Sequence, residues 1–372
     1  MIGAVMPMNF VLDCKPRRFV QIVAILWLAG GVFVSAEVIA HHGAVTNPAL
    51  YRDQDIVELE GEITDVFWRN PHPRFSLRVL GEDAEETIWE LELNRSAVSW
   101  SYRGITADDF PKPGERIRVA GFISRRDSRS LGILHLLLPN GQEFVNGFRE
   151  LRWSSARMLT EMQEPDSGKV EIAEQAAVGV FRVWGEDVDG SGAHPPLSEY
   201  AYLLTERGKE LAAAYDPVTQ FQELDCRQGM PTTMFDPVPM QLINNGDRIL
   251  IRVQEYDIER IIYMDVDSRE VGSEGSPLGH SVGRWEGDTL IVDTAHVAWP
   301  YLDPYGTPQS DQVRYRETFS LSGAGDVLNY SITITDPTMF IESLTFERAR
   351  AWTAGMELVP YDCIAHWEGL TG

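Results

Sequence analysis

Short segments in which apolar and polar residues alternate recur along the chain, and they constrain its fold more than any other feature. In RFSLRVL (74–80) the odd-numbered apolar residues fall on one face, and the same spacing returns in 87–93 and 115–123. Period-two alternation is typical of a strand with one buried face, and the Gly, Pro and Asn residues between the segments indicate turns. Because no strand–helix–strand rhythm accompanies it, the pattern predicts an all-β protein with a little helix.

The spacing of these segments divides the chain into four expected regions. Residues 1–40 form a signal peptide, and 41–146 contain about five strands that suggest a small OB-like barrel. Residues 147–235 are a connector of loops and helix, in which Thr205 is the expected N-cap of the best helix. Residues 236–372 are expected to form an up-and-down, lipocalin-like antiparallel barrel. Its eight or nine expected strands are 238–244, 249–256, 259–266, 280–285, 289–296, 313–321, 327–335, 340–348 and 357–364.

The N-terminus has the layout of a secretory signal. Lys15, Arg17 and Arg18 precede an apolar run over 19–34, and small residues offer cleavage after Ala36 or Ala40. The run is shorter than the roughly 20 residues of a membrane span, although an uncleaved anchor remains an alternative. We therefore expect a periplasmic or secreted protein with no stable membrane insertion after cleavage.

The charge of the chain narrows its partners. The formal net charge is −24 at pH 7, and so acidic a surface repels phosphate backbones. We expect no nucleic-acid partner and favour a small-molecule ligand. The sequence does not indicate an oligomeric state.

Residues 279–283 (GHSVG) fit the G-x-S-x-G pattern of a hydrolase nucleophile elbow. An elbow needs a strand before its serine and a helix after it. Here a loop precedes the pattern, and a turn and a strand follow it. The flanking sequence favours a β-hairpin over a catalytic Ser281.

Several charged or hydroxyl-bearing residues share a strand face with apolar residues. They are Glu255, Arg260, Glu317, Tyr330 and Asp336. A charge inside an apolar barrel is costly unless it is paired, so Arg260 is expected to pair with a glutamate.

Two interpretations of this face stay open: a ligand site and a structural ion pair that fixes the register of the barrel. The ligand interpretation assigns binding to Arg260, Arg284, Trp285, Tyr330 and Asp336. A related hypothesis is an acid–base isomerase, cyclase or hydratase that uses the same cavity. Its expected catalytic residues are Glu317, Glu255 and His280.

Histidines suggest a third function, copper binding. Cleavage after Ala40 would leave His41 at the mature N-terminus, where its amine and imidazole nitrogens suit Cu(II). His72, in NPHPRF, is the expected second histidine of such a site. An accidental pair of histidines is the alternative.

The mature chain keeps two cysteines, Cys226 and Cys363. In an oxidising compartment they are expected to form a disulfide, with two buried free thiols as the alternative.

Two stretches resemble known exported proteins. AHHGAVTNPALYRDQDIVELEGEITDVFWRNPHPRFSL and KPGERIRVAG resemble an uncharacterised family of exported bacterial proteins that shares the A-H-H start, NPH and a presumed OB-like barrel. The motifs YDP, CRQGMP, RIIYMD, LGHSVGRWEGDTLIVDT, ITDP and YDC are similar to a β-domain of related exported proteins. The resemblance supports the architecture and implies no particular activity. It draws attention to Cys226, Arg260, His280, Arg284, Trp285, Glu286 and Cys363.

Overall fold

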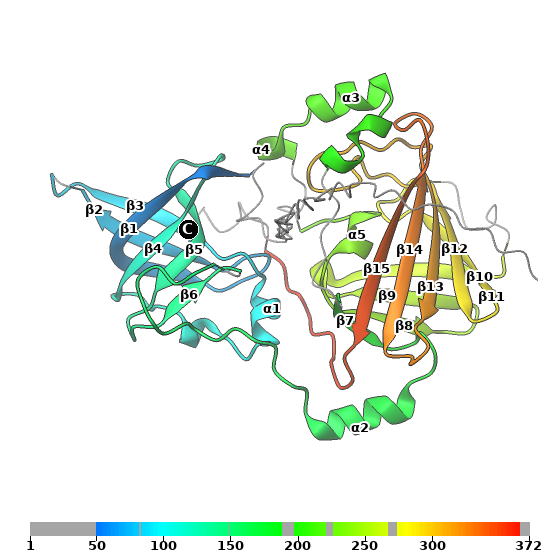
Figure 1. Cartoon of the computed structure of the whole chain (residues 1–372), viewed down its shortest axis with the longest axis horizontal. Coiled ribbons are helices and arrows are strands. Elements are labelled where there is room, and N and C mark those ends of the chain that lie inside the picture. Colours follow the sequence, from blue (N-terminus) through cyan, green and yellow to red (C-terminus); the bar gives the residue numbers. More distant parts are fainter. Residues whose placement is uncertain are drawn as a thin grey trace, which may run out of the picture. The chain divides into compact units, whose positions relative to one another are not determined.

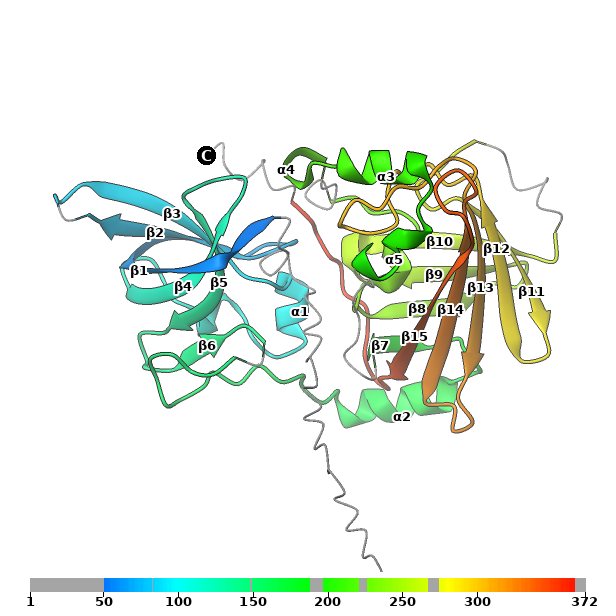
Figure 2. The same cartoon turned by 45° about the horizontal axis from the view of Figure 1, so that its top comes forward.

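The alternating segments fold into two closed β-barrels, which Figure 1 and Figure 2 show from two directions. The structure is a computed structural model that describes residues 50–81, 83–147, 149–187, 197–220, 226–266 and 274–364. The all-β prediction is confirmed. The predicted signal peptide and His41 lie outside the described residues. Among the residues that are described, no helix is long and apolar enough to cross a membrane.

The first barrel is closed by five strands of the described chain and has the topology of an OB fold. Its strands are β1 (Tyr51–Phe67), β2 (Arg74–Leu80), β3 (Glu86–Glu92), β4 (Arg116–Ser124) and β5 (Ser130–Leu137). Their order around the barrel is β1-β2-β3-β5-β4, and the β3–β5 pair is parallel. Helix α1 (Ala97–Ser101) lies between β3 and β4 in sequence, and the short strand β6 (Glu143–Val145) extends the sheet beside β5. This arrangement confirms the predicted OB-like barrel.

The long strand β1 pairs with β4 along its first part and with β2 along its last part, and the β3–β5 pair closes the barrel. Gly61 lies where the two pairings meet. A Cβ at this position would come within 2.2 Å of the Arg78 carbonyl oxygen, so the close approach of the two strands requires glycine. The register between β4 and β5 shifts at Gly121, where the sequence predicts a bulge or bend.

The second barrel is a closed meander of nine strands within the described chain. Its strands are β7 (Val183–Asp187), β8 (Met240–Asn244), β9 (Arg248–Val253), β10 (Ile258–Met264), β11 (His280–Glu286), β12 (Thr289–Ala295), β13 (Arg314–Leu321), β14 (Val327–Thr335) and β15 (Leu344–Trp352). Neighbours in sequence are neighbours in the barrel, and β15 closes it against β7. A closed meander with an odd number of strands must contain a parallel pair, which here is β10–β11. The expected barrel is confirmed, but the parallel pair and the ninth strand distinguish it from an eight-stranded, fully antiparallel lipocalin.

Two segments differ from the expected strands. Strand β7 comes from the range 147–235, which the sequence assigns to the connector. The range 357–364, expected as the last strand, contributes to no strand and forms only an isolated bridge between Cys363 and Asn70. The barrel therefore takes its ninth strand from before β8 and leaves the C-terminal segment outside the sheet.

The remaining elements are short helices. They are η2 (Ala107–Asp109), α2 (Ser167–Ala176), η3 (Leu197–Glu199), η4 (Ala201–Leu203), α3 (Glu206–Ala213), α4 (Pro217–Gln220), α5 (Thr232–Phe235) and η6 (Glu255–Asp257). Thr205 caps α3 as predicted, since its hydroxyl accepts a hydrogen bond from the Gly208 amide at 3.1 Å. All four residues of α5 are buried. The ring of Phe235 packs 6.2 Å from Tyr330 and 5.7 Å from Phe346, so α5 fills part of the second barrel.

Candidate functional site

A group of five hydrogen-bonded polar side chains faces the interior of the second barrel. Arg260 on β10, Glu317 on β13 and Tyr330 on β14 are 2%, 0% and 2% exposed. Ser281 on β11 and Thr294 on β12 are buried beside them. We call these residues the Arg260 cluster. The structure thus places Arg260, Glu317 and Tyr330 on the apolar face to which the alternation assigns them.

The members of the Arg260 cluster bond to one another. The guanidinium of Arg260 makes a bidentate ion pair with Glu317, in which Nη1 donates to Oε1 at 2.8 Å and Nη2 donates to Oε2. Nη2 also donates to the hydroxyls of Ser281 at 2.9 Å and Thr294 at 2.8 Å. Tyr330 donates its hydroxyl to Glu317 Oε1 at 2.9 Å, and Thr294 donates to Oε2 at 3.2 Å. The ion pair therefore has the additional hydrogen bonds that a buried pair needs.

Burial and the ion pair together determine the direction in which the pKa values of Arg260 and Tyr330 are shifted. Burial alone would lower the pKa of Arg260, but the Glu317 carboxylate outweighs it and holds that pKa above its ordinary value. Burial, and then the negative charge of Glu317, raise the pKa of Tyr330 well above its ordinary value. Arg260 is therefore charged and Tyr330 neutral at physiological pH. The arrangement is that of a self-contained ion pair, which needs no ligand for its satisfaction.

Ser281 belongs to this cluster and not to a nucleophile elbow. It is the second residue of β11, which turns directly into β12, so no helix follows it. Its hydroxyl accepts a hydrogen bond from Arg260, and the adjacent His280 lies on the opposite face of the strand. The local structure confirms the β-hairpin interpretation.

The other predicted residues of the β11–β12 hairpin lie outside the cluster. A ring nitrogen of His280 contacts the backbone oxygen of Glu274 at 2.6 Å. Arg284 forms a half-exposed ion pair with Asp293 at 2.8 Å. Trp285 is 41% exposed and packs 6.0 Å from Phe181. These contacts are typical of the outer surface and the rim of a barrel.

Asp336 and Glu255 lie beyond the ends of their strands. Asp336 is buried directly after β14, where it accepts hydrogen bonds from the Ser310 amide at 2.6 Å and the Ser310 hydroxyl at 2.8 Å. Glu255 lies in the η6 turn that follows β9. The three predicted catalytic residues, Glu317, Glu255 and His280, thus occupy three different surroundings: the barrel interior, a turn and the outer face.

Glu255 belongs to a second, half-buried group of charges, together with Asp236. Burial raises the pKa of Asp236 to about 6, while a hydrogen bond from Gln228, a hydrogen bond shared with Glu255 and the charges of Arg350 and Arg348 partly oppose the increase. Arg350 donates to the backbone oxygens of Val238 at 2.8 Å and Asp236 at 2.6 Å, so it anchors the segment that leads into β8.

The raised pKa of Asp236 predicts a pH-dependent effect on stability. Folded Asp236 holds its proton up to about pH 6, whereas the unfolded residue, with an ordinary pKa of 3.8, loses it earlier. The contribution of Asp236 to stability therefore falls as the pH rises from about 4 to about 6. Asparagine mimics the protonated acid, so we expect Asp236→Asn to gain on the wild type by on the order of 1–2 kcal/mol between pH 4 and pH 7. Urea unfolding at several pH values measures this gain, and a gain of the same size in the exposed control Asp265→Asn would contradict the assignment.

A different polar site lies at one end of the first barrel, around His72. The imidazole Nδ1 of His72 lies 2.7 Å from Glu92 Oε1, and Glu92 is 2% exposed. The buried Tyr51 donates its hydroxyl to Glu92 Oε2 at 2.7 Å. Burial, and then the Glu92 charge, raise the pKa of Tyr51 well above its ordinary value. Both oxygens of Glu92 are thus engaged, and the residue is placed to orient the imidazole.

Strand register brings these residues together. Residues 68–73 connect β1 to β2, and Arg74 is paired with Glu92 across the β2–β3 hairpin. Arg74 donates to Glu90 at 3.1 Å and lies over the ring of Phe67. Mainly because of burial, the pKa of Glu90 is raised. In OB folds the loops between β1 and β2 and between β4 and β5 flank the ligand-binding face, so His72 lies in a position that this fold uses for binding.

His72 lines a small cavity at this end of the barrel, which we call the His72 pocket. Its walls also include Phe67, Asn70, Arg74 and Ile364. The cavity has a volume of about 10 Å³, close to the smallest space that holds one water molecule. Such a space suits a single ion or water and not an organic ligand. Over the described ranges, no three His, Cys, Asp or Glu side chains form a metal-binding group.

Sequence reasoning identifies His72 but misses Glu92 and Tyr51. Glu92 alternates with the apolar Leu91 and Leu93, which makes it look like an exposed residue of a half-buried strand. The pairing of Arg74 with Glu92 supplies the missing signal, because His72 is separated from Arg74 by one residue. If the pairing of strands 74–80 and 87–93 had been predicted residue by residue, it would have placed the side chains of His72 and Glu92 close together.

A family match covers most of the first barrel. Residues 31–133 match a protein family of unknown function, DUF6152. This range includes His41, His72 and Glu92, so the His72 pocket lies largely within the matched region. No curated protein matches the sequence.

Proposed function

We propose that this chain is an exported protein that binds a copper ion at the His72 pocket. The observation that carries the proposal is the 2.7 Å contact between His72 Nδ1 and the buried Glu92. Histidines that bind metals usually donate their other ring N–H to a carboxylate, which fixes the tautomer and the ring orientation. With Nδ1 held by Glu92, the Nε2 of His72 is the nitrogen that binds the metal.

Three further features support an exported protein that binds a small ion. The pocket has room for one ion, and Glu92 lines it beside His72. The matched family region also contains His41, whose imidazole and terminal amine would complete a nitrogen ligand set after cleavage at Ala40. Imidazole and amine nitrogens favour Cu(II) among the common divalent ions. The disulfide between Cys226 and Cys363 agrees with export into an oxidising compartment.

A ligand site or an acid–base enzyme in the second barrel is a weaker proposal. Arg260 and Glu317 satisfy each other, and the predicted catalytic partners of Glu317 lie elsewhere. Of the two interpretations that the sequence leaves open, the Arg260 cluster fits the structural ion pair better than the ligand site.

Calorimetric titration of residues 41–372 with CuCl₂ tests the proposal. We expect one Cu(II) per chain, and we expect His72→Ala to weaken binding by about 100-fold or more. Glu92→Gln is expected to weaken it by roughly 10–100-fold, the usual effect of removing an outer-shell partner. His41→Ala should also weaken binding, because it removes the second imidazole.

His280→Ala is the matched control, since it removes a histidine of the second barrel that lies outside the His72 pocket. Its affinity should equal that of the wild type, and near-ultraviolet circular dichroism should show that all variants are folded. Equal copper affinities of the wild type and His72→Ala would overturn the proposed function.

A further inference from the structure

The C-terminal segment 357–364, which we call the strap, lies outside both barrel sheets and is held by side chains. The amide of Gln254 binds both backbone groups of Val359: its Oε1 accepts from the Val359 N–H at 3.2 Å, and its Nε2 donates to the carbonyl. The hydroxyl of Tyr102 shares its one proton between Gln254 Oε1 at 2.5 Å and the Glu357 carbonyl at 2.8 Å. The strap thus obtains from side chains the backbone partners that a strand would obtain from a sheet.

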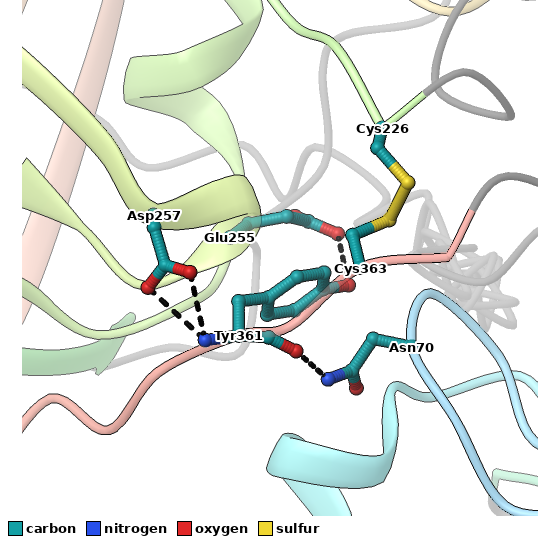
Figure 3. Close-up of a disulfide and its surroundings, with 6 residues drawn as sticks. All are labelled: Asn70, Cys226, Glu255, Asp257, Tyr361 and Cys363. Atoms are coloured by element: carbon teal, nitrogen blue, oxygen red, sulfur yellow. Dashed lines mark hydrogen bonds between the residues drawn. A yellow bond between two sulfur atoms is a disulfide. The ribbon is translucent and has the colours of Figure 1, made fainter.

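The turn after β9 is shaped to hold Tyr361 of the strap. Both carboxylate oxygens of Asp257 accept from the Tyr361 N–H at 3.0 Å, and the Tyr361 hydroxyl donates to Glu255 at 3.2 Å (Figure 3). The buried ring of Tyr361 packs 5.3 Å from Tyr256. Tyr256 and Asp257 have φ values of 56° and 51°, a conformation that non-glycine residues adopt rarely and that clusters where structure serves a specific role.

The other side of the strap contacts the loop that presents His72. Asn70 donates its side-chain amide to the Tyr361 carbonyl (Figure 3). Its backbone carbonyl accepts from the Ile364 N–H at 3.1 Å. The Asn70 side-chain oxygen accepts from the Val98 amide at 3.1 Å. Ile364 itself lines the His72 pocket. The strap therefore supports the loop two residues before His72 and forms one wall of the pocket.

A disulfide secures the strap at Cys363, between Tyr361, which the turn after β9 holds, and Ile364, which contacts Asn70. Cys363 is bonded to Cys226, and both residues are partly exposed. The disulfide lies next in sequence to Ile364 and beside Tyr361 (Figure 3). As a tether it keeps the effective concentration of the strap at its binding site high.

We propose that the redox state of the Cys226–Cys363 disulfide controls metal binding at the His72 pocket through the strap. The proposal rests on the proposed function and names its regulation. A dithiol reductant breaks the S–S bond, and the protein gains two electrons and two protons as two thiols while the reductant becomes a disulfide. The released strap then withdraws Ile364 from the pocket and its hydrogen bonds from Asn70, so the His72 loop loses its support.

Amide hydrogen exchange and copper titration of the same samples test this control. We compare the oxidised wild type, the wild type in dithiothreitol, and Cys226→Ser/Cys363→Ser. We expect the amides of Val359, Tyr361 and Ile364 to exchange faster by on the order of tenfold without the disulfide. The Val98 amide, which reports on Asn70, should also exchange faster, and the copper affinity should fall by about tenfold. Faster exchange in the strap with an unchanged Val98 amide and an unchanged copper affinity would overturn the proposal, as would a strap that stays protected after reduction.

A second variant tests the strap when the cysteine variant fails to fold. Asp257→Gly keeps the disulfide, permits the positive φ and removes both hydrogen bonds to the Tyr361 amide. It lies outside the His72 pocket, so it is expected to lower copper affinity only by loosening the strap. Asp265→Gly, at φ 54° in an exposed turn, is the matched control and should behave as the wild type. Wild-type affinity in Asp257→Gly, together with a faster Tyr361 amide, would contradict the proposal. If the oxidised wild type binds no copper, the proposed function itself fails, and exchange at Val98 alone decides whether the disulfide controls the loop.

Discussion

Replacing Glu317 with alanine is expected to lower the free energy of unfolding by about 3–5 kcal/mol. The substitution leaves the guanidinium of Arg260 charged, 2% exposed and without its carboxylate, and it also removes the acceptor of the Tyr330 hydroxyl. An uncompensated buried charge is among the most destabilising defects that a single substitution can produce. Urea unfolding followed by tryptophan fluorescence measures the loss.

Two comparisons separate this electrostatic origin from a general loss of contacts. Glu347→Ala, at an exposed position of the same barrel, should change the stability by no more than about 0.5 kcal/mol. The double variant Arg260→Met/Glu317→Leu should recover most of the lost stability, because apolar residues of similar volume often replace a buried ion pair without cost. A Glu317→Ala protein with the stability of the wild type would show that the ion pair does not hold the barrel together.

The inward orientation of the buried charges and the pairing of Arg260 with a glutamate could be predicted from sequence, whereas the hydroxyl groups that join the pair could not. Alternation within each strand places Arg260 and Glu317 on the apolar face, and the structure agrees. Which face of β11 points inward depends on its parallel pairing with β10, where Ser281 lies opposite Ile262. A shift of one residue would have turned His280 inward instead. The expected association of His280 with the charges therefore depended on a register that a single strand does not encode.

The last strand was predicted wrongly for a local reason. The segment 357–364 has apolar residues at suitable positions, but Pro360 has no N–H for a ladder and the neighbouring backbone groups bond to side chains. Strand β7 escaped notice because it is five residues long and includes Gly185. Cβ placement at Gly185 would bring it within 2.4 Å of the Thr353 side chain, so its glycine reflects a contact distant in sequence.

Removing the disulfide with Cys226→Ser/Cys363→Ser is expected to lower the free energy of unfolding by roughly 4–5 kcal/mol in the chain-entropy account. The two cysteines are 137 residues apart, so the bond closes a loop that contains β8 to β15. The cross-link lowers the conformational entropy of the unfolded chain, because it excludes many of its conformations. It does not lower the conformational entropy of the native chain, so the native state is favoured. Unfolding in urea without reductant measures the difference between the variant and the wild type.

The same measurement in dithiothreitol gives the control, because the reduced wild type and the double serine variant then lack the same bond. Their unfolding free energies should agree within about 0.5 kcal/mol, the usual range for a surface substitution. A loss much below 4 kcal/mol in the oxidised comparison would mean that the unfolded chain is already compact around these cysteines, since residual structure reduces the entropy that a cross-link removes. An equal loss in oxidised and reduced samples would instead assign the effect to the serine side chains, and the tether that holds Tyr361 and Ile364 would then contribute little to the folded state.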